Sequence, residues 1–492
     1  MTARSWFVVL GLAAAAVFAA SGDERVTPVV AAATDAPSVA ESTLDDQTDL
    51  NVTVYNADLA LVRDVRNIRL PKEVTDLRFQ DIAATVNPAT VHIRSLSDPG
   101  RVTVLEQNYE YDLLEPDKLL RKYVGRDVTL VRRRTENGAT REDAVTARLL
   151  SYNGAPVWRI GNEIVTGIAV DHIRYPELPG NLFVRPTLIW TLKNSGGAAH
   201  RVEASYLATK LAWKADYVLT VGREETIADL DGWVTLTNGS GTSFRNASLQ
   251  LVAGELNRVR EALGKARLMD LAERAVPAAA AQMAEESFSD YHLYRLARRT
   301  TINHNETKQV SMLGAMGFPV RKRYVVDGQA VYYRNAQHPG SPLIDDVQVF
   351  FEFTNDEKRG LGMPMPSGTI RVYQADSTGA LQFVGEDRIR HTPKDETLNV
   401  KIGHAFDLVA ERKQLDFRRV ADDVVEIEVA VTLRNHKSLP VTIEVNEPIG
   451  GTWRMLRSSH RWTKTDAWAA QFVVPVAADG ETTVSYRVRV TY

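Results

Sequence analysis

The chain has 492 residues, enough for roughly three domains, and its 44% hydrophobic and 25% charged residues are typical of a globular protein. Its 59 Lys and Arg nearly balance 62 Asp and Glu, for a formal net charge of −3, which gives no reason to expect nucleic acid or an anionic membrane as partner. It contains no cysteine, which excludes disulfides, thiolate metal ligands and a cysteine nucleophile.

Residues 1–22 are typical of a secretory signal peptide. Arg4 precedes an apolar run from Trp6 to Ala20, which is shorter than the about 20 residues that a membrane span needs. Cleavage could fall near residues 20–22 or after the small residues 31–33, and the alternative is an uncleaved N-terminal anchor. No later stretch is apolar enough to span a bilayer. We therefore predict an exported protein, periplasmic or secreted.

Residues 23–49 are rich in Ala, Ser, Thr, Asp and Pro, which predicts a disordered lead-in. The first folded unit is predicted at 50–173. It consists of short alternating strands separated by turns such as Asn153-Gly154. Its one predicted helix spans 116–123, with Pro116 in the first turn. This unit is expected to be a small β-barrel or sandwich.

The second unit is predicted at 174–345 and contains longer strands. A weak repeat begins here, in which a strand with the pattern apolar–x–apolar–x ends at an asparagine. It ends at Asn194, Asn238, Asn355 and Asn435. We interpret each copy as a strand that leaves its sheet into a turn that tolerates asparagine. Immunoglobulin-like sandwiches are built from such elements.

Residues 255–299 interrupt the β pattern. Leu268, Leu271 and Ala275 lie on one face of a predicted helix over 258–276, and Pro277 interrupts it. Residues 278–286 are expected to form a second short helix or a tether. The tip of this helical insertion is a candidate partner surface, and the alternative is a solvated insertion without a specific role.

The third unit, 346–492, shows the clearest strand pattern. Residues 425–433 alternate apolar with polar side chains, and residues 483–492 repeat the alternation. A period of two indicates strands with one buried face. The predicted fold is therefore mainly β, with tandem antiparallel, immunoglobulin-like sandwich domains and a short helical insertion.

The common local signatures of hydrolases, nucleotide-binding proteins and metalloproteases do not occur in the sequence. We accordingly predict no catalytic, cofactor-binding or metal-ligating residue. The densest polar cluster lies within 385–396 and contains Glu386, Asp387, Arg388, His391, Lys394 and Asp395. It could bind a cation or transfer protons. The alternative, which we favour, is a solvated charged hairpin with its turn at 393–395.

Trp213 and Tyr217 lie four residues apart, which places both on the same face of a strand. A position in the core is the default for such a pair. An exposed position would instead suggest that a ligand stacks on the rings.

Six segments resemble those of a bacterial family, the domain-of-unknown-function family 4139, related to mucoidy inhibitor A-like proteins. They are V-Y-N-A-D-L-A-L-V-R from Val54, L-E-Q-N-Y-E-Y-D-L-L from Leu105, A-W-K-A-D-Y from Ala212, G-W-V-T-L-T-N-G-S-G-T-S-F-R-N-A-S-L-Q-L-V-A-G-E from Gly232, N-E-T-K-Q-V from Asn305 and V-G-E-D-R-I-R-H-T-P-K-D-E from Val384. The resemblance implies a β-rich exported protein and brings no catalytic residues. The long coiled coil of the mucoidy-inhibitor branch is shortened here to 258–299.

From these observations we predict a non-enzymatic interaction or scaffold module of the cell envelope or periplasm, with envelope proteins or glycans as partners. The alternative is a glycan-binding protein or a hydrolase that acts on envelope polysaccharide. That alternative would use the cluster at 386–396 or the face of Trp213 and Tyr217. Two carboxylates about 5 to 9 Å apart across a cleft would favour glycoside hydrolysis.

Overall fold

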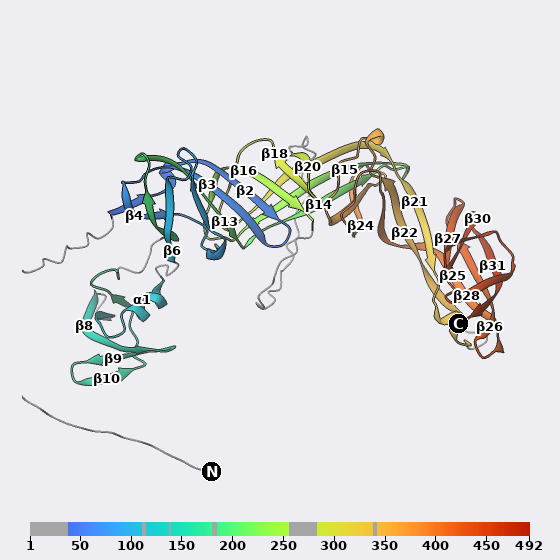
Figure 1. Ribbon diagram of the computed structural model, residues 1–492. Coiled ribbons are helices and arrows are strands. Elements are labelled where there is room, and N and C mark those ends of the chain that lie inside the picture. The colour runs from blue at the N-terminus through green and yellow to red at the C-terminus, as the bar shows by residue number, and fades with distance from the viewer. Residues whose placement is uncertain (1–37, 111–114, 137–138, 180–184, 255–282, 338–341) are drawn as a thin grey trace, which may run out of the picture.

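The computed structural model describes residues 38–110, 115–136, 139–179, 185–254, 283–337 and 342–492 (Figure 1). Of the described residues, 67% lie in strands and 5% in helices, so the predicted fold class, mainly β, is confirmed at this level. The immunoglobulin-like assignment stays a prediction. The predicted signal peptide, 1–22, and the predicted helix, 258–276, lie outside the described residues.

The N-terminal part is built from two sheets that share a core. One has the order β1 (Ser38–Ser42), β4 (Glu73–Gln80), β12 (Thr187–Asn194), β6 (Val102–Glu110). The other has the order β17 (Met283–Phe288), β18 (Tyr291–Leu296), β16 (Phe244–Ala253), β2 (Gln47–Tyr55), β3 (Leu59–Arg69), β13 (Ala199–Ala208), β5 (His92–Ser95), and β19 (Thr300–Ile302) also pairs with β16. A short 3-10 helix, η2 (Pro88–Thr90), precedes β5.

Two expectations change in this part. Residues 38–49, expected in a disordered lead-in, instead form β1, a 3-10 helix η1 (Leu44–Asp46) and the start of β2. The physical reasons are the parallel pairing of β1 with β4 and a capping box between Thr43 and Asp46. Where the expected helical insertion reaches described residues, 283–296 form β17 and β18, because these strands pair with each other and extend the sheet.

Between β6 and β12 the chain forms a small domain, 115–179, with its own core. It contains a helix, α1 (Pro116–Lys122), and a sheet of order β10 (Glu163–Thr166), β9 (Pro156–Ile160), β8 (Ala139–Tyr152), β7 (Asp127–Glu136), β11 (His172–Arg174). Its buried residues form a cluster of their own around Trp158 and Leu149. In Figure 1 this domain lies to one side of the N-terminal sheets. The expected unit 50–173 therefore contains this domain and strands of the N-terminal sheets.

The middle of the molecule is a sheet of order β20 (Glu306–Pro319), β15 (Ile227–Asn238), β14 (Leu211–Val221), β23 (Gly368–Ala375), β24 (Leu381–Ile389). Its inner face continues the core of the N-terminal sheets. β14 and β23 run parallel, which is one of several parallel pairings that period-two patterns did not predict.

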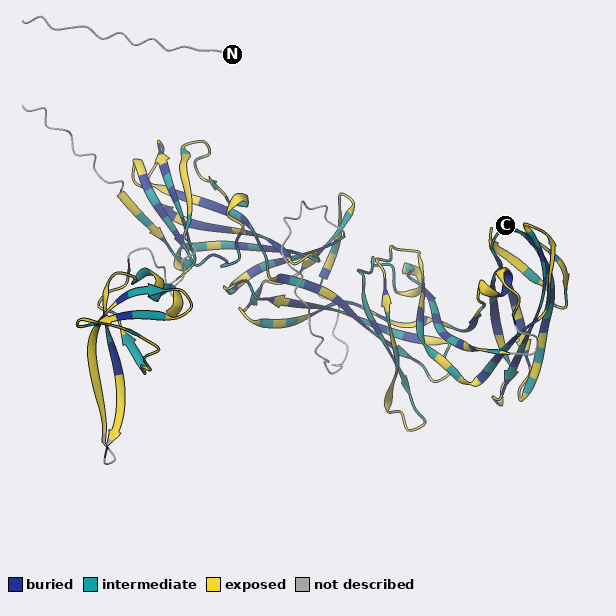
Figure 2. Cartoon of the chain, turned by 90° about the horizontal axis from the view of Figure 1, so that it is seen from below, coloured by how far each residue is buried: buried dark blue, intermediate teal, exposed yellow. Residues whose placement is uncertain are grey.

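The C-terminal sheet has the order β28 (Thr452–Ser458), β31 (Gly480–Thr491), β26 (Val424–Asn435), β25 (Thr397–Ala421), β22 (Leu343–Thr354), β21 (Arg321–Asp327), β27 (Val441–Pro448), β30 (Ala469–Val476), β29 (Trp462–Asp466). A short helix, α2 (Val331–Arg334), lies between β21 and β22, and a 3-10 helix, η3 (Glu357–Arg359), lies between β22 and β23 of the middle sheet. Figure 2 shows buried and exposed residues alternating along its strands.

The strands β22 and β25 connect the middle of the molecule to its C-terminal end. Phe351 of β22 and Val400 of β25 belong to the core of the middle part, whereas Val347 and Ala410 of the same strands belong to the C-terminal core. The expected boundary at 345/346 thus lies within β22. The result is an elongated row of sandwich-like units with continuous strands between them (Figure 1).

The asparagines of the repeated strand end are all buried, and each bonds the loop that follows it. At Asn238, Nδ2 donates to the carbonyls of Thr242 (2.9 Å) and Asn303 (3.0 Å), and Oδ1 accepts from Ser240 N (3.0 Å). The same pattern, an acceptor for a backbone N–H and a donor to carbonyls of two segments, occurs at Asn194, Asn355 and Asn435. The asparagines were expected only to be tolerated in a turn. Their side chains instead hold two loops together through hydrogen bonds to the backbone, and we call each of them a clamp.

Candidate functional site

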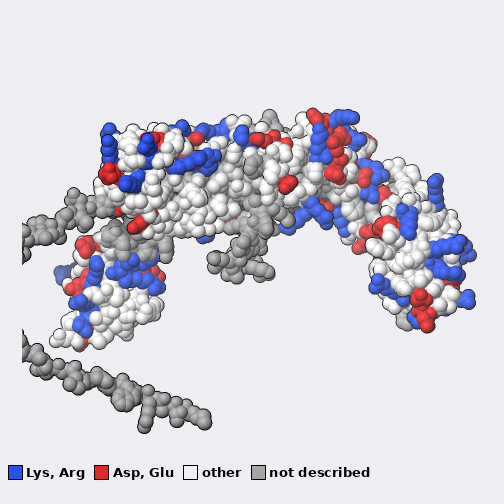
Figure 3. Space-filling model, viewed as in Figure 1, with Lys and Arg blue, Asp and Glu red and all other residues white. Residues whose placement is uncertain are grey.

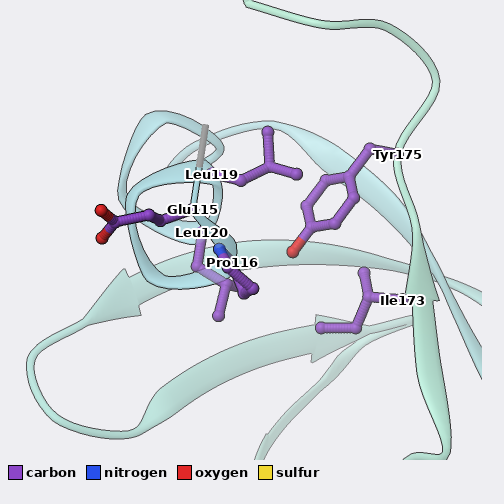
Figure 4. A pocket seen from close by; sticks show the side chains of 6 residues that line it. All are labelled: Glu115, Pro116, Leu119, Leu120, Ile173 and Tyr175. Atoms are coloured by element: carbon purple, nitrogen blue, oxygen red, sulfur yellow. The ribbon is translucent and has the colours of Figure 1, made fainter. Parts of the chain in front are cut away.

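An apolar groove on the small domain is the candidate site. It lies between α1 and the end of β11 and encloses about 400 Å³. Its lining is Glu115, Pro116, Leu119, Leu120, Ile173 and Tyr175 (Figure 4). In Figure 4 the side chains of Leu119, Ile173 and Tyr175 border the groove, and the Glu115 carboxylate points away from them. The walls are therefore mainly hydrocarbon.

The local sequence explains why a short helix stands at this place. Pro116 occupies the first turn, where no intrahelical N–H is needed, and Asp117 lies at the positive end of the helix. The helix ends at Lys122, and the residue that caps it, Tyr123, is 1% exposed. The Tyr123 hydroxyl donates to the carbonyl of Glu177 (2.5 Å) and accepts from its N–H (3.2 Å). These bonds fix α1 against the chain that follows β11.

The same packing leaves the groove open. Leu119, Leu120, Ile173 and Tyr175 are partly buried against the small domain's core, so one side of each remains exposed. Tyr175 contacts Tyr123 edge to face, with ring centroids 4.8 Å apart. Burial raises the pKa of Tyr175, and the neighbouring tyrosines raise it further, so its hydroxyl is neutral at physiological pH. The groove can therefore accept an apolar group, with a neutral hydroxyl at its wall.

The two predicted aromatic residues lie in the core. Trp213 is 4% exposed and contacts Tyr294 with ring centroids 6.4 Å apart. Tyr217 is fully buried, and its hydroxyl donates to the carbonyl of Pro366 (2.7 Å). The default expectation of a core position is confirmed, and the alternative of an exposed stacking face is wrong, because β14 is an inner strand whose 213–217 face packs inward.

The charged residues of 386–396 lie on β24 and in the loop that leads from it to β25. β24 belongs to the middle sheet and β25 to the C-terminal sheet, so they do not form the expected hairpin ladder. Glu386 pairs with Arg371 (3.3 Å), and Asp387 accepts from the backbone N–H groups of Lys401 (2.8 Å) and Arg388 (2.7 Å).

The remaining members lie around the exposed loop between these strands. Lys394 pairs with Glu357 (2.6 Å), and His391 lies 3.2 Å from Ser367 N. Asp395 is exposed in the turn with a φ of 66°. Glu386, Asp387, His391 and Lys394 each make a side-chain contact to a residue outside the cluster, as in a solvated face. In the part of the chain that the structure describes, no group of three or more His, Cys, Asp or Glu is placed to hold a metal ion.

Oppositely charged side chains are interspersed over the face shown in Figure 3. Among the described residues, cross-strand ion pairs include Arg323 with Glu352 (2.9 Å) and Arg489 with Glu426 (2.6 Å). Such pairs orient neighbouring strands and leave no broad face of one sign in this view.

A buried charged cluster in the C-terminal core was not predicted. Arg412 of β25 is 0% exposed and bonds Asp345 (2.8 Å) and Glu447. Tyr333 of α2 donates to the other oxygen of Glu447 (2.5 Å) and so accepts from Tyr486 (2.6 Å). The sequence did contain one signal for the burial of Arg412. This residue stands at an alternate position after Leu408 and Ala410, and all three share the inner face of β25.

The electrostatics of this cluster favour the ionised arginine. Burial opposes the charge of Arg412, but Glu447 and the tyrosines outweigh it and hold the arginine pKa well above its usual value. Burial, reinforced by Glu447, raises the pKa of Tyr333 well above its usual value. The cluster is therefore one arginine between two carboxylates, with two neutral hydroxyls beside Glu447, and it stabilises the fold.

The fold and its groove define a class, an elongated mainly β protein of sandwich-like units with a small inserted domain. No protein-family model matches the chain, and no curated protein sequence matches it. Within the described residues, no helix is long and apolar enough to cross a membrane.

Proposed function

We propose that this chain is an exported, non-enzymatic scaffold protein of the cell envelope, and that the groove of the small domain is its contact for a protein partner. The apolar run from Trp6 to Ala20 supports export. The elongated row of sandwich-like units suits a spacer, and the resemblance to the mucoidy inhibitor A-like family is consistent with it. An immunoglobulin-like identity of these units is part of the proposal.

The groove is the observation on which the proposal depends. Its volume of about 400 Å³ accepts one or two large side chains of a partner. Four apolar side chains, Leu119, Leu120, Ile173 and Tyr175, would each gain a contact there. Burial of one large apolar anchor stabilises a complex by about 1.5–3 kcal/mol before the entropic cost of association. A partner with an exposed Leu or Phe on a short segment fits this site.

The test is chemical crosslinking in intact cells followed by purification of the chain and identification of what is joined to it. We expect a defined protein partner with the native chain and its loss with Leu120→Glu, which places a charge in the groove. The matched control is Ile164→Glu on β10 of the same domain, where the native side chain is already 67% exposed. This variant should retain the partner.

Folding of both variants is checked by circular dichroism and thermal unfolding. Retention of the partner by Leu120→Glu would contradict the proposal. Copurification of envelope glycan with every form, without a protein partner, would support the alternative of a glycan-binding protein or hydrolase. That alternative no longer has an aromatic platform at Trp213 and Tyr217, because both rings lie in the core.

A further inference from the structure

β24 ends the middle sheet, and part of its outer edge is open. β23 pairs with one side of β24, and no other described strand pairs with it. From Gly385 onward β25 covers the edge, since Asp387 accepts from Lys401 N (2.8 Å) and a Cβ on Gly385 would lie 2.3 Å from the Ile402 carbonyl. Residues 381–384 precede this cover, in the hairpin that includes β24 in Figure 1.

The backbone groups at this edge can be assigned from the hairpin bonds. Asp376 N donates to Ala380 O (2.9 Å), so the polar backbone groups of Ala380 point to β23. Their direction alternates along an antiparallel strand, so those of Gln382 also point to β23. Those of Leu381 and Phe383 therefore point to the open edge. The edge presents two N–H and two C=O groups to a further strand.

The side chains at this edge are apolar on their exposed face. Leu381 and Phe383 share one face of β24 and are 56% and 55% exposed. The Phe383 ring contacts Tyr373 of β23 at 5.7 Å between centroids. The other face is polar: Gln374 donates to Glu225 (3.2 Å). Water thus meets the apolar face of this hairpin, which is the reverse of the usual arrangement.

The two edges of the C-terminal sheet are protected against pairing. β28 has Arg454 and Arg457 and a bulge between them, and β29 has Lys464 and a bulge that follows it. Charged side chains and bulges prevent two edges from associating. Residues 380–384, in contrast, are Ala-Leu-Gln-Phe-Val and contain no charge. No charge repulsion within these residues therefore opposes the approach of the same strand from a second copy of the chain.

We propose that β24 pairs with β24 of a second copy of this chain, antiparallel, about a two-fold axis at Gln382. This register places Leu381 of one copy opposite Phe383 of the other, with both on the apolar face. It also exchanges hydrogen bonds between the backbone groups that point outward, and it places the two Gln382 side chains together on the polar face. The edge is therefore complementary to itself, as a two-fold interface requires.

The expected dimer is weak. A ladder of about four residues buries less than the roughly 1,200 Å² of a stable interface, so association should depend on protein concentration. The proposal is independent of the groove and of its partner, because the two surfaces lie on different domains.

The absence of cysteine allows a direct test of the register. Gln382→Cys places the two thiols at a non-hydrogen-bonded pair, with Cα atoms about 4.5 Å apart, within reach of a disulfide. We expect protein purified from the cells that produce it to form a crosslinked dimer on mild oxidation. The control is Ser377→Cys at the exposed hairpin tip, whose two copies would lie about 30 Å apart in this register.

A second measurement needs no crosslink. Sedimentation should show the average mass of the native chain rising toward twice the monomer with concentration. Phe383→Lys, at an exposed site, should remain monomeric, while Ile164→Lys should behave like the native chain. Equal crosslinking of both cysteine variants, a disulfide between Gln382→Cys and a different protein in intact cells, or a native chain that stays monomeric at all concentrations would overturn the proposal.

Discussion

The buried asparagines at the strand ends satisfy backbone groups that their loops leave without partners. Asn238 is fully buried and bonds the carbonyls of Thr242, Ile302 and Asn303. Such a side chain mimics a stretch of backbone, with one donor group and one acceptor on a short stem. Alanine at this position would leave several carbonyls and one N–H in the interior without a partner.

We therefore expect Asn238→Ala to lower the free energy of unfolding by roughly 2–4 kcal/mol, since each unsatisfied buried group costs about 1–3 kcal/mol. The measurement is urea unfolding followed by tryptophan fluorescence. The control is Asn67→Ala on β3, where the side chain is exposed and a change within about 0.5 kcal/mol is expected. Equal losses in the two variants would show that the clamp adds nothing.

The sequence predicted those elements whose signal lies within the element itself. The alternation over 425–433 lies within β26, and the helix expected at 116–123 is α1, 116–122. Alternation shows which face of a strand is buried, but not which strand lies beside it. The parallel pairs and the nesting of the small domain between β6 and β12 were therefore not predictable.

The candidate site could not be predicted either, because the sequence does not show which distant segments lie side by side. Its lining comes from 115–120 and 173–175, which the intervening strands β7 to β10 bring together. Neither segment contains a recognisable motif. Apolar side chains near a proline occur in many cores and do not indicate a groove. The four asparagines were visible as a repeat, but their burial depends on loops that are distant in sequence, such as Asn303 for Asn238.

At the scale of elements, β25 connects two cores and has a buried charge in one of them. Arg412 follows Leu408 and Ala410 on the inner face, where an apolar side chain would continue the pattern. A buried ion pair is costly to break because the remaining charge loses its partner. We expect Arg412→Met to lower the free energy of unfolding by roughly 3–5 kcal/mol.

The double variant Arg412→Met with Glu447→Gln should recover part of this loss, because it removes one of the two carboxylates, Glu447 and Asp345, that the single variant leaves without a charged partner. A double-mutant cycle from urea unfolding measures the recovery. Arg489→Met, which breaks a half-exposed pair with Glu426, should cost at most about 1 kcal/mol and serves as the control. A double variant no more stable than Arg412→Met alone would show that charge pairing is not the source of the loss.

At the scale of the whole molecule, the small domain is an insertion that the sandwich does not need. β6 and β12 pair directly, and Glu110 is the cross-strand partner of Thr187. The chain therefore leaves and re-enters the sheet at neighbouring points. The small domain has its own sheet and its own buried cluster, so its stability comes mainly from within.

Replacing residues 111–184 with a short Gly-Ser linker should accordingly leave the rest of the chain folded, with its thermal midpoint within a few degrees of the native value. Circular dichroism and calorimetry measure this. Because the groove leaves with the small domain while β24 remains, the shortened chain should lose the crosslinked partner and keep the concentration-dependent dimer. A shortened chain that aggregates or melts far below the native chain would instead show that the small domain supports the sandwich, and that partner binding and fold cannot be separated in this way.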